Sequence, residues 1–183
     1  MRETYPTALA FVLQSEGGFN DDAGDSGGPT LHGITWGDLA DYRRIPRISI
    51  RSHRDQITLI KSMRPGEQAD IYKTRYWDRI EGDQLAYPID MITFDAAVNL
   101  GVGVAITLLD EAVQLPPHLA PDPILLQRIK DKVTKGKLKQ VELDELTDRI
   151  TRYRAIVGRH PEDAKFLHGW LNRVAALKAK VGA

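Results

Sequence analysis

The feature that most constrains the fold is a polar stretch, residues 17–34, set in a chain that is otherwise patterned for helices. The stretch is rich in Gly, Asp and Asn and has no helical period. It follows an apolar run at 7–16 with near-helical spacing, which Gly17 ends. Irregular segments of this length in small domains are usually functional or disordered. We therefore expect a short loop or β-hairpin after the first helix, and we look for function there.

The rest of the chain predicts a mainly α fold. Thr35 is expected to cap the second helix with Asp38 in a capping box, and Asp122 to cap a helix that begins at Pro123. Residues 45–50 are expected to form a short extended piece. Apolar spacing predicts the other helices at 54–63, 66–79, 88–100, 104–114, 122–134, 141–158 and 161–181.

Composition excludes several classes of protein. The 183 residues carry 25 basic and 25 acidic side chains, a balance that argues against a nucleic-acid binder. There is no cysteine, so disulfides, thiolate zinc sites and cysteine nucleophiles are excluded. No apolar run reaches the roughly 18 residues of a membrane span. The net charge is −6 over the first 42 residues, +2 over residues 43–100 and +4 over residues 101–183. This asymmetry indicates either different roles for the two ends of the chain or chance placement of charged residues.

No targeting segment and no metal site are predicted. The N-terminal residues lack a long apolar run and an early cleavage site, so we expect no signal peptide. The histidines show no metal-ligand spacing, and no cofactor or metal is expected. Those outside the polar stretch are His53, His118, His160 and His168.

Two motifs in the polar stretch do not hold. Residues 24–29, GDSGGP, resemble the serine segment of trypsin-like proteases, but no histidine precedes them and the surroundings are helical. Oxygen-bearing side chains from Asn20 to Asp25 suggest calcium. A helix–loop–helix site needs Glu at its twelfth position, where this chain has Leu31, so only an irregular calcium site stays open.

A third interpretation takes the stretch as a glycosidase site. Glu16 ends the first helix, Asp25 lies nine residues later and Thr30 fourteen later. Cleaving a glycosidic bond needs an acid for the leaving oxygen and a second group that handles water or the oxocarbenium-like transition state. Glu16, Asp25 and Thr30 supply those groups if the loop folds back. The alternative is an ordinary helix end followed by a turn.

The same stretch resembles glycoside hydrolase family 108, the N-acetylmuramidases or lysozyme-like peptidoglycan hydrolases of phages and bacteria. The resemblance rests on EGGF at 16–19, Asp25, Gly27-Gly28, Thr30 and Gly33-Ile34-Thr35. It extends to IYKTRYWDRIEGDQL (71–85), FDAAVNLGVGVA (94–105) and FLHGWLNRV (166–174). The similarity therefore touches most of the chain.

The resemblance implies a lysozyme-like helical fold and hydrolysis of the β-1,4 bond between N-acetylmuramic acid and N-acetylglucosamine. Glu16 matches the family's catalytic glutamate and is expected to be the general acid. Asp25 would position water or stabilise charge, and Thr30 would orient the water, with inversion by analogy to phage-type lysozymes. In those enzymes the threonine lies one residue further along than Thr30.

The resemblance also implies two regions. Residues 1–85 would form the catalytic muramidase region, and 86–183 a helical C-terminal lobe resembling a peptidoglycan-binding region, packed as one globular unit with the first. The segment 115–127 departs from the family pattern.

Five further residues are candidates for contact with the sugar. The aromatic ones could stack on sugar rings, although aromatic side chains are more often core. Asn99 shares a helix face with Asp95 and could bind N-acetyl groups or hold neighbouring backbone. The candidates are His32, Trp36, Tyr76, Trp77 and Asn99.

The sequence thus predicts a monomeric bacteriolytic endolysin of a phage or prophage, made in the host cytoplasm and acting on peptidoglycan in the periplasm or cell wall, with export through a holin. Two alternatives stay open: a lytic transglycosylase acting on the same bond, and a non-catalytic wall-binding protein. A lysine run at 130–139 is most simply a solvated face, and could also contact an anionic wall or membrane.

Overall fold

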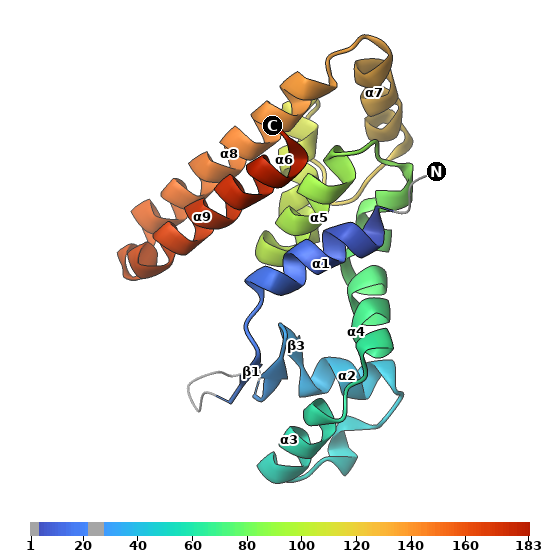
Figure 1. The fold of residues 1–183 in the computed structure, drawn as a ribbon, viewed down its shortest axis with the longest axis vertical. Coiled ribbons are helices and arrows are strands. Elements are labelled where there is room, and N and C mark those ends of the chain that lie inside the picture. The colour runs from blue at the N-terminus through green and yellow to red at the C-terminus, as the bar shows by residue number, and fades with distance from the viewer. Residues whose placement is uncertain (1–3, 22–27) are drawn as a thin grey trace. The chain divides into compact units, whose positions relative to one another are not determined.

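The computed structural model describes residues 4–21 and 28–183, which form helices and one small antiparallel sheet (Figure 1). The chain divides into two compact units. We call Leu9–Arg75 the small unit, and Met1–Ala8 with Tyr76–Ala183 the large unit. The expected division at residue 85 stays a prediction.

The small unit combines the sheet with short helices. The strands pair antiparallel in the order β1-β2-β3, with Phe19 opposite Leu31 and Leu31 opposite Ile34. Helix α1 runs into this unit from the large one. The elements are α1 (Tyr5–Ser15), β1 (Phe19–Asn20), β2 (Thr30–Leu31), β3 (Ile34–Thr35), α2 (Trp36–Tyr42), a 3-10 turn (Arg47–Ser49), α3 (His53–Lys61) and α4 (Pro65–Tyr72).

Side-chain caps fix where two of these helices begin. The Thr35 hydroxyl accepts a hydrogen bond from the Asp38 backbone N–H at 3.1 Å, and the Asp38 carboxylate accepts one from the Thr35 N–H at 3.2 Å. This reciprocal box satisfies two backbone donors that a helix start leaves unpaired. The predicted start of the second helix is therefore confirmed. Ser52 and Asp55 form the same box at the start of α3.

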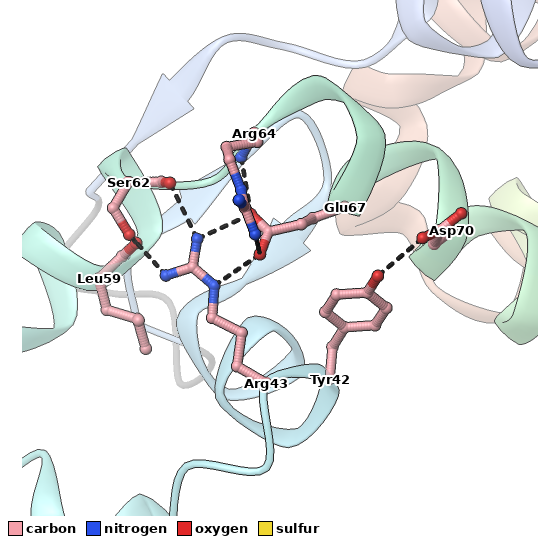
Figure 2. A network of polar contacts seen from close by, with 7 residues as sticks. All are labelled: Tyr42, Arg43, Leu59, Ser62, Arg64, Glu67 and Asp70. Carbon is pink, nitrogen blue, oxygen red and sulfur yellow. Dashed lines mark hydrogen bonds and ion pairs between the residues drawn. The ribbon is translucent and has the colours of Figure 1, made fainter.

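An ion network ties α4 to the end of α2 (Figure 2). Arg43 donates two hydrogen bonds to the Glu67 carboxylate, at 2.8 and 2.7 Å, and Arg64 donates another at 2.9 Å. Arg43 also bonds the Ser62 hydroxyl and carbonyl, at 2.7 and 2.9 Å. The two guanidinium groups hold the pKa of the buried Glu67 carboxyl well below its usual range. The network fixes the first turn of α4.

Among the described residues, the large unit is built from helices α5 to α9 and three 3-10 turns, Asp78–Ile80, Gly82–Gln84 and Pro161–Asp163. Helices α8 and α9 lie side by side, and α8 also packs on α5 and α6 (Figure 1). Asp122 caps α7 by accepting from the Leu125 N–H at 2.7 Å, as predicted. The helices are α5 (Ile89–Leu100), α6 (Val102–Ala112), α7 (Pro123–Thr134), α8 (Leu138–Arg159) and α9 (Ala164–Val181).

A charged cluster lies buried among α5, α8 and α9. Asp95 bridges Arg149 at 2.7 Å and Arg173 at 2.9 Å, and neither Asp95 nor Arg149 is exposed. Glu145 is also fully buried and accepts a hydrogen bond from the Thr93 hydroxyl at 2.9 Å. Burial raises the pKa of Glu145 to about 8.

Two expectations about elements need correction. Residues 45–50 are not extended: Arg47–Ser49 form a 3-10 turn, in which the Ser49 N–H bonds the Pro46 carbonyl at 2.9 Å. The helix expected at 66–79 ends at Tyr72, and a π turn (Lys73–Trp77) and a 3-10 turn (Asp78–Ile80) follow. Within 4–21 and 28–183, no helix is both long and apolar enough to cross a membrane.

Candidate active site

A tight hairpin turn in the small unit is the centre of the candidate site. His32 and Gly33 join β2 to β3 with φ angles of 48° and 74°. Two successive residues with positive φ are the mark of a type I′ turn, whose twist matches that of the paired strands. Gly33 adopts this conformation without steric cost, because it has no Cβ.

The Glu16 carboxylate lies against this turn. Glu16 follows α1 directly, with its backbone N–H bonded to the Val12 carbonyl at 3.1 Å, and its side chain is half-buried. A Cβ placed on Gly33 would lie 2.9 Å from Glu16 Oε2 and 2.8 Å from Tyr72 Oη. Glycine at position 33 therefore leaves room for the acid and the phenol beside the same backbone atom.

Tyr72 is a site residue that the sequence reasoning missed. It ends α4, is 2% exposed, and donates from its hydroxyl to the His32 carbonyl at 2.7 Å. This bond anchors the hairpin turn to the helix that the Glu67 network holds. The signal in the sequence that could have found it is its place in the segment 71–85, which resembles family 108.

Thr30 lies in the central strand of the sheet. It pairs with Asn20 on β1 and with Thr35 on β3, so the three polar side chains share one face. Thr30 is half-buried. Asp25, the second predicted carboxylate, lies outside the described residues.

His32 and Trp36 both belong to the small unit. His32 Nδ1 is buried and has no hydrogen-bond partner in the described part of the chain. Trp36 is half-buried at the first position of α2, and its backbone N–H donates to the Pro29 carbonyl at 3.0 Å. Its indole lies over Gly28, where a Cβ would come within 2.9 Å of Nε1. Contact of these two residues with substrate stays a prediction.

The other three candidates belong to the large unit. Trp77 is 1% exposed, donates to Asp83 at 2.9 Å and packs its ring against Phe94, with centroids 5.5 Å apart. A sugar cannot reach this ring, so we do not carry Trp77 into the proposed substrate site. The side-chain oxygen Oδ1 of Asn99 accepts a hydrogen bond from the Tyr153 hydroxyl. Tyr76 is half-buried, and its role and that of Asn99 stay predictions.

The described residues show no cluster of three or more His, Asp or Glu side chains that could hold a metal ion. At the end of β1, His53 Nε2 lies 2.9 Å from Asp21 Oδ1. The cation–π contact of Lys61 with the Phe19 ring, 4.3 Å from its centroid, holds the same strand.

The sequence model of the family described as glycosyl hydrolase 108 matches residues 9–101, just over half of the chain. The chain belongs to this family. The match covers the whole small unit, including Glu16, Thr30, the hairpin turn and Tyr72. Membership makes the protein a glycoside hydrolase and supports peptidoglycan as its substrate.

A solved structure shares the fold of this family 108 chain. The structure of Brucella abortus SagA has 22% sequence identity and a TM-score of 0.76, covering 99% of this chain and 95% of that one. This likeness confirms the expected lysozyme-like, mainly helical fold. No curated protein sequence matches the chain.

Proposed function

We propose that this family 108 enzyme is an N-acetylmuramidase that hydrolyses the β-1,4 bond between N-acetylmuramic acid and N-acetylglucosamine, with Glu16 as general acid. The observation that carries the proposal is the position of the Glu16 carboxylate against the Gly33 backbone, beside the Tyr72 hydroxyl. Because Glu16 is half-buried beside a glycine, a bulky sugar can approach its carboxylate while the carboxylate is held in one orientation.

Inverting hydrolysis needs a proton donor at the leaving oxygen and an attacking water on the opposite face of the sugar ring. Glu16 gives its proton to the leaving oxygen as the bond to the anomeric carbon breaks. Asp25 either positions the attacking water and accepts its proton or stabilises the developing positive charge, and the Thr30 hydroxyl orients that water. Inversion of the anomeric centre follows if the two carboxyl groups are about 6.5–9.5 Å apart, whereas about 5–5.5 Å gives retention.

The first test is clearing of purified peptidoglycan by the wild type and by Glu16→Gln. We expect the variant to lose about 10²- to 10⁴-fold in rate, the usual contribution of a general acid. Glu162→Gln is the matched control, because this carboxylate is 72% exposed in the large unit and should retain full activity. Equal clearing by the wild type and Glu16→Gln would remove Glu16 from the mechanism.

Analysis of the products separates the two enzymatic alternatives. A hydrolase leaves reducing muramic acid ends, while a lytic transglycosylase leaves anhydro-muramic acid, which is lighter by one water. Mass spectrometry of the digest distinguishes them, and NMR of the fresh anomer distinguishes inversion from retention. A protein that binds peptidoglycan but leaves it uncut in both forms would be the non-catalytic wall binder.

The biological setting belongs to the same proposal. A glycoside hydrolase of this family would act on the cell wall as a phage or prophage endolysin, reaching its substrate with the help of a holin. Expression in a bacterial host with and without a holin tests this directly. Lysis only in the presence of both proteins is the expected result.

A further inference from the structure

The turn between α7 and α8 in the large unit brings positive side chains around one hollow. The hollow has a volume of about 370 Å³. Four basic residues and one acidic residue line it, which leaves a clear positive excess. These residues are Arg128, Asp131, Lys132, Lys135 and Lys137.

The backbone brings these residues to one side of the α7–α8 turn. Arg128, Lys132 and Lys135 follow one another at helical spacings of four and three, so they share one face at the end of α7. Gly136, with φ of 63°, then reverses the chain. The Lys137 N–H donates back to the Lys132 carbonyl at 2.9 Å, which closes a Schellman turn and returns Lys137 toward the same face.

Among the described residues, these four cations have no anionic partner. Within the described chain none of them has a carboxylate within 4.0 Å, whereas Arg43, Arg149 and Arg173 are all paired. Asp131 lines the hollow but accepts a hydrogen bond from Gln127 at 2.8 Å. Basic residues in the last turn of a helix favour its negative end, which accounts for Lys132 and Lys135. That effect does not account for Arg128, in the second turn of α7, or for Lys137 beyond its end.

Like charges gathered without partners repel one another, and a bound anion would relieve the repulsion. A carboxylate brings a single charge, whereas a phosphate group presents several oxygens and a greater charge density to lysine and arginine donors. We propose that this hollow, which we call the α7–α8 basic hollow, binds a phosphate group of an envelope component. The hollow contains no residue of the proposed catalytic machinery, and we assign it to attachment and not to cleavage.

The test uses calorimetric titration of the full chain with sodium tripolyphosphate at low salt. We expect saturable binding that Lys132→Ala/Lys135→Ala/Lys137→Ala weakens about tenfold or more, given the loss of three charge contacts. The control Lys165→Ala/Lys178→Ala/Lys180→Ala removes the same charge from exposed positions on α9 and should bind nearly as the wild type does. Lys135→Glu is a second, single-site variant at an exposed position, and thermal midpoints show that each variant folds.

Three outcomes overturn the proposal: no saturable binding, equal weakening by the control, or equally tight binding of the tricarboxylate tricarballylate. The source of the phosphate is then separated with vesicles. Co-sedimentation with phosphatidylglycerol vesicles that tripolyphosphate reverses supports a lipid headgroup, and no co-sedimentation alongside tripolyphosphate binding supports a phosphate-bearing wall polymer. Clearing of phosphate-free peptidoglycan should be unchanged in the variant Lys132→Ala/Lys135→Ala/Lys137→Ala. If the phosphate-binding tests fail, the muramidase proposal is therefore unaffected.

Discussion

At the scale of single residues, Gly33 carries two requirements at once. Its φ of 74° lies in the left-handed region, and the space where a Cβ would be lies within 3 Å of both Glu16 Oε2 and Tyr72 Oη. The first requirement concerns stability and the second concerns the proposed site. The effect of substituting Gly33 can therefore be compared with that of substituting a glycine that has positive φ but no neighbouring side chain.

We expect Gly33→Ala to destabilise the protein by about 1 kcal/mol, the cost of a left-handed alanine. We also expect about 100-fold lower clearing of peptidoglycan, because the new methyl group displaces the carboxylate. Gly182→Ala is the control, since Gly182 also has positive φ, 72°, but open space around the added methyl. Denaturant titration and turbidity measure the two effects. If both variants clear peptidoglycan equally well, contact between Gly33 and Glu16 has no part in catalysis.

Some residues of the proposed site can be predicted from the sequence, and others cannot. Glu16 and Thr30 could be singled out because they are polar residues at fixed spacings in one local stretch. Tyr72 could not, because its bond to His32 joins residues 40 positions apart and depends on how α4 packs. Trp77 illustrates the reverse case: the residue type suits sugar stacking, but burial against Phe94 decides its role.

At the scale of elements, α4 depends on one carboxylate. Glu67 accepts from both Arg43 and Arg64, and this pairing joins the first turn of α4 to the end of α2. Since α4 ends at Tyr72, the pairing also supports the hairpin turn through the bond to His32. Loss of the Glu67 carboxylate should therefore also destabilise the hairpin turn at His32.

We expect Glu67→Gln to lower the free energy of unfolding at pH 7 by about 2 kcal/mol, since hydrogen bonds to charged groups are lost. The pKa of Glu67 is depressed in the folded state. Its contribution to stability is therefore present above the ordinary value of 4.5 and is lost as the pH falls through the folded-state pKa. The difference between wild type and variant should shrink from pH 7 to pH 3 in urea titrations.

Asp41→Asn is the comparison for that experiment. Asp41 also pairs with an arginine, Arg47, but the side chains are 49% and 53% exposed. Solvent screens such pairs, so this change should have a much smaller effect at pH 7. An equal effect of the two substitutions would contradict the importance given to the Glu67 network.

Elements were predictable where local chemistry decides them. Thr35 with Asp38, and Asp122 before Pro123, begin helices because short side chains there can satisfy backbone N–H groups. The end of α4 was not predictable, because apolar spacing continues past Tyr72 while the backbone changes to a π turn. The Trp77 ring that ends this π turn packs closely on Gly82, where a Cβ would lie 2.5 Å from the ring.

At the scale of the whole molecule, Glu145 links global stability to pH. Burial raises its pKa to about 8, so the folded protein keeps a proton that the unfolded chain releases near 4.5. Between these values the unfolded state binds fewer protons, and stability falls as pH rises. The buried Glu145 carboxyl therefore lowers the stability of the folded protein in neutral solution.

We expect Glu145→Gln to make the protein more stable at pH 8, by at least about 1 kcal/mol, and to change little at pH 4. Glutamine keeps an oxygen that can accept from the Thr93 hydroxyl. Urea titrations at pH 4, 6 and 8 check this, with Glu162→Gln as the exposed control. A variant with the same pH slope as the wild type would show that Glu145 ionises normally.

The division into units has a consequence for how the protein is made. The first eight residues belong with Tyr76–Ala183, while Leu9–Arg75 lies between these two pieces in the chain. A ribosome therefore releases the whole small unit, Glu16 and its hairpin turn included, while the large unit still lacks most of its helices. Domains generally fold as they emerge. The small unit can thus fold first, and Tyr5 in the N-terminal segment gains its ring contacts with Trp77 and Phe94 only after those residues have been made.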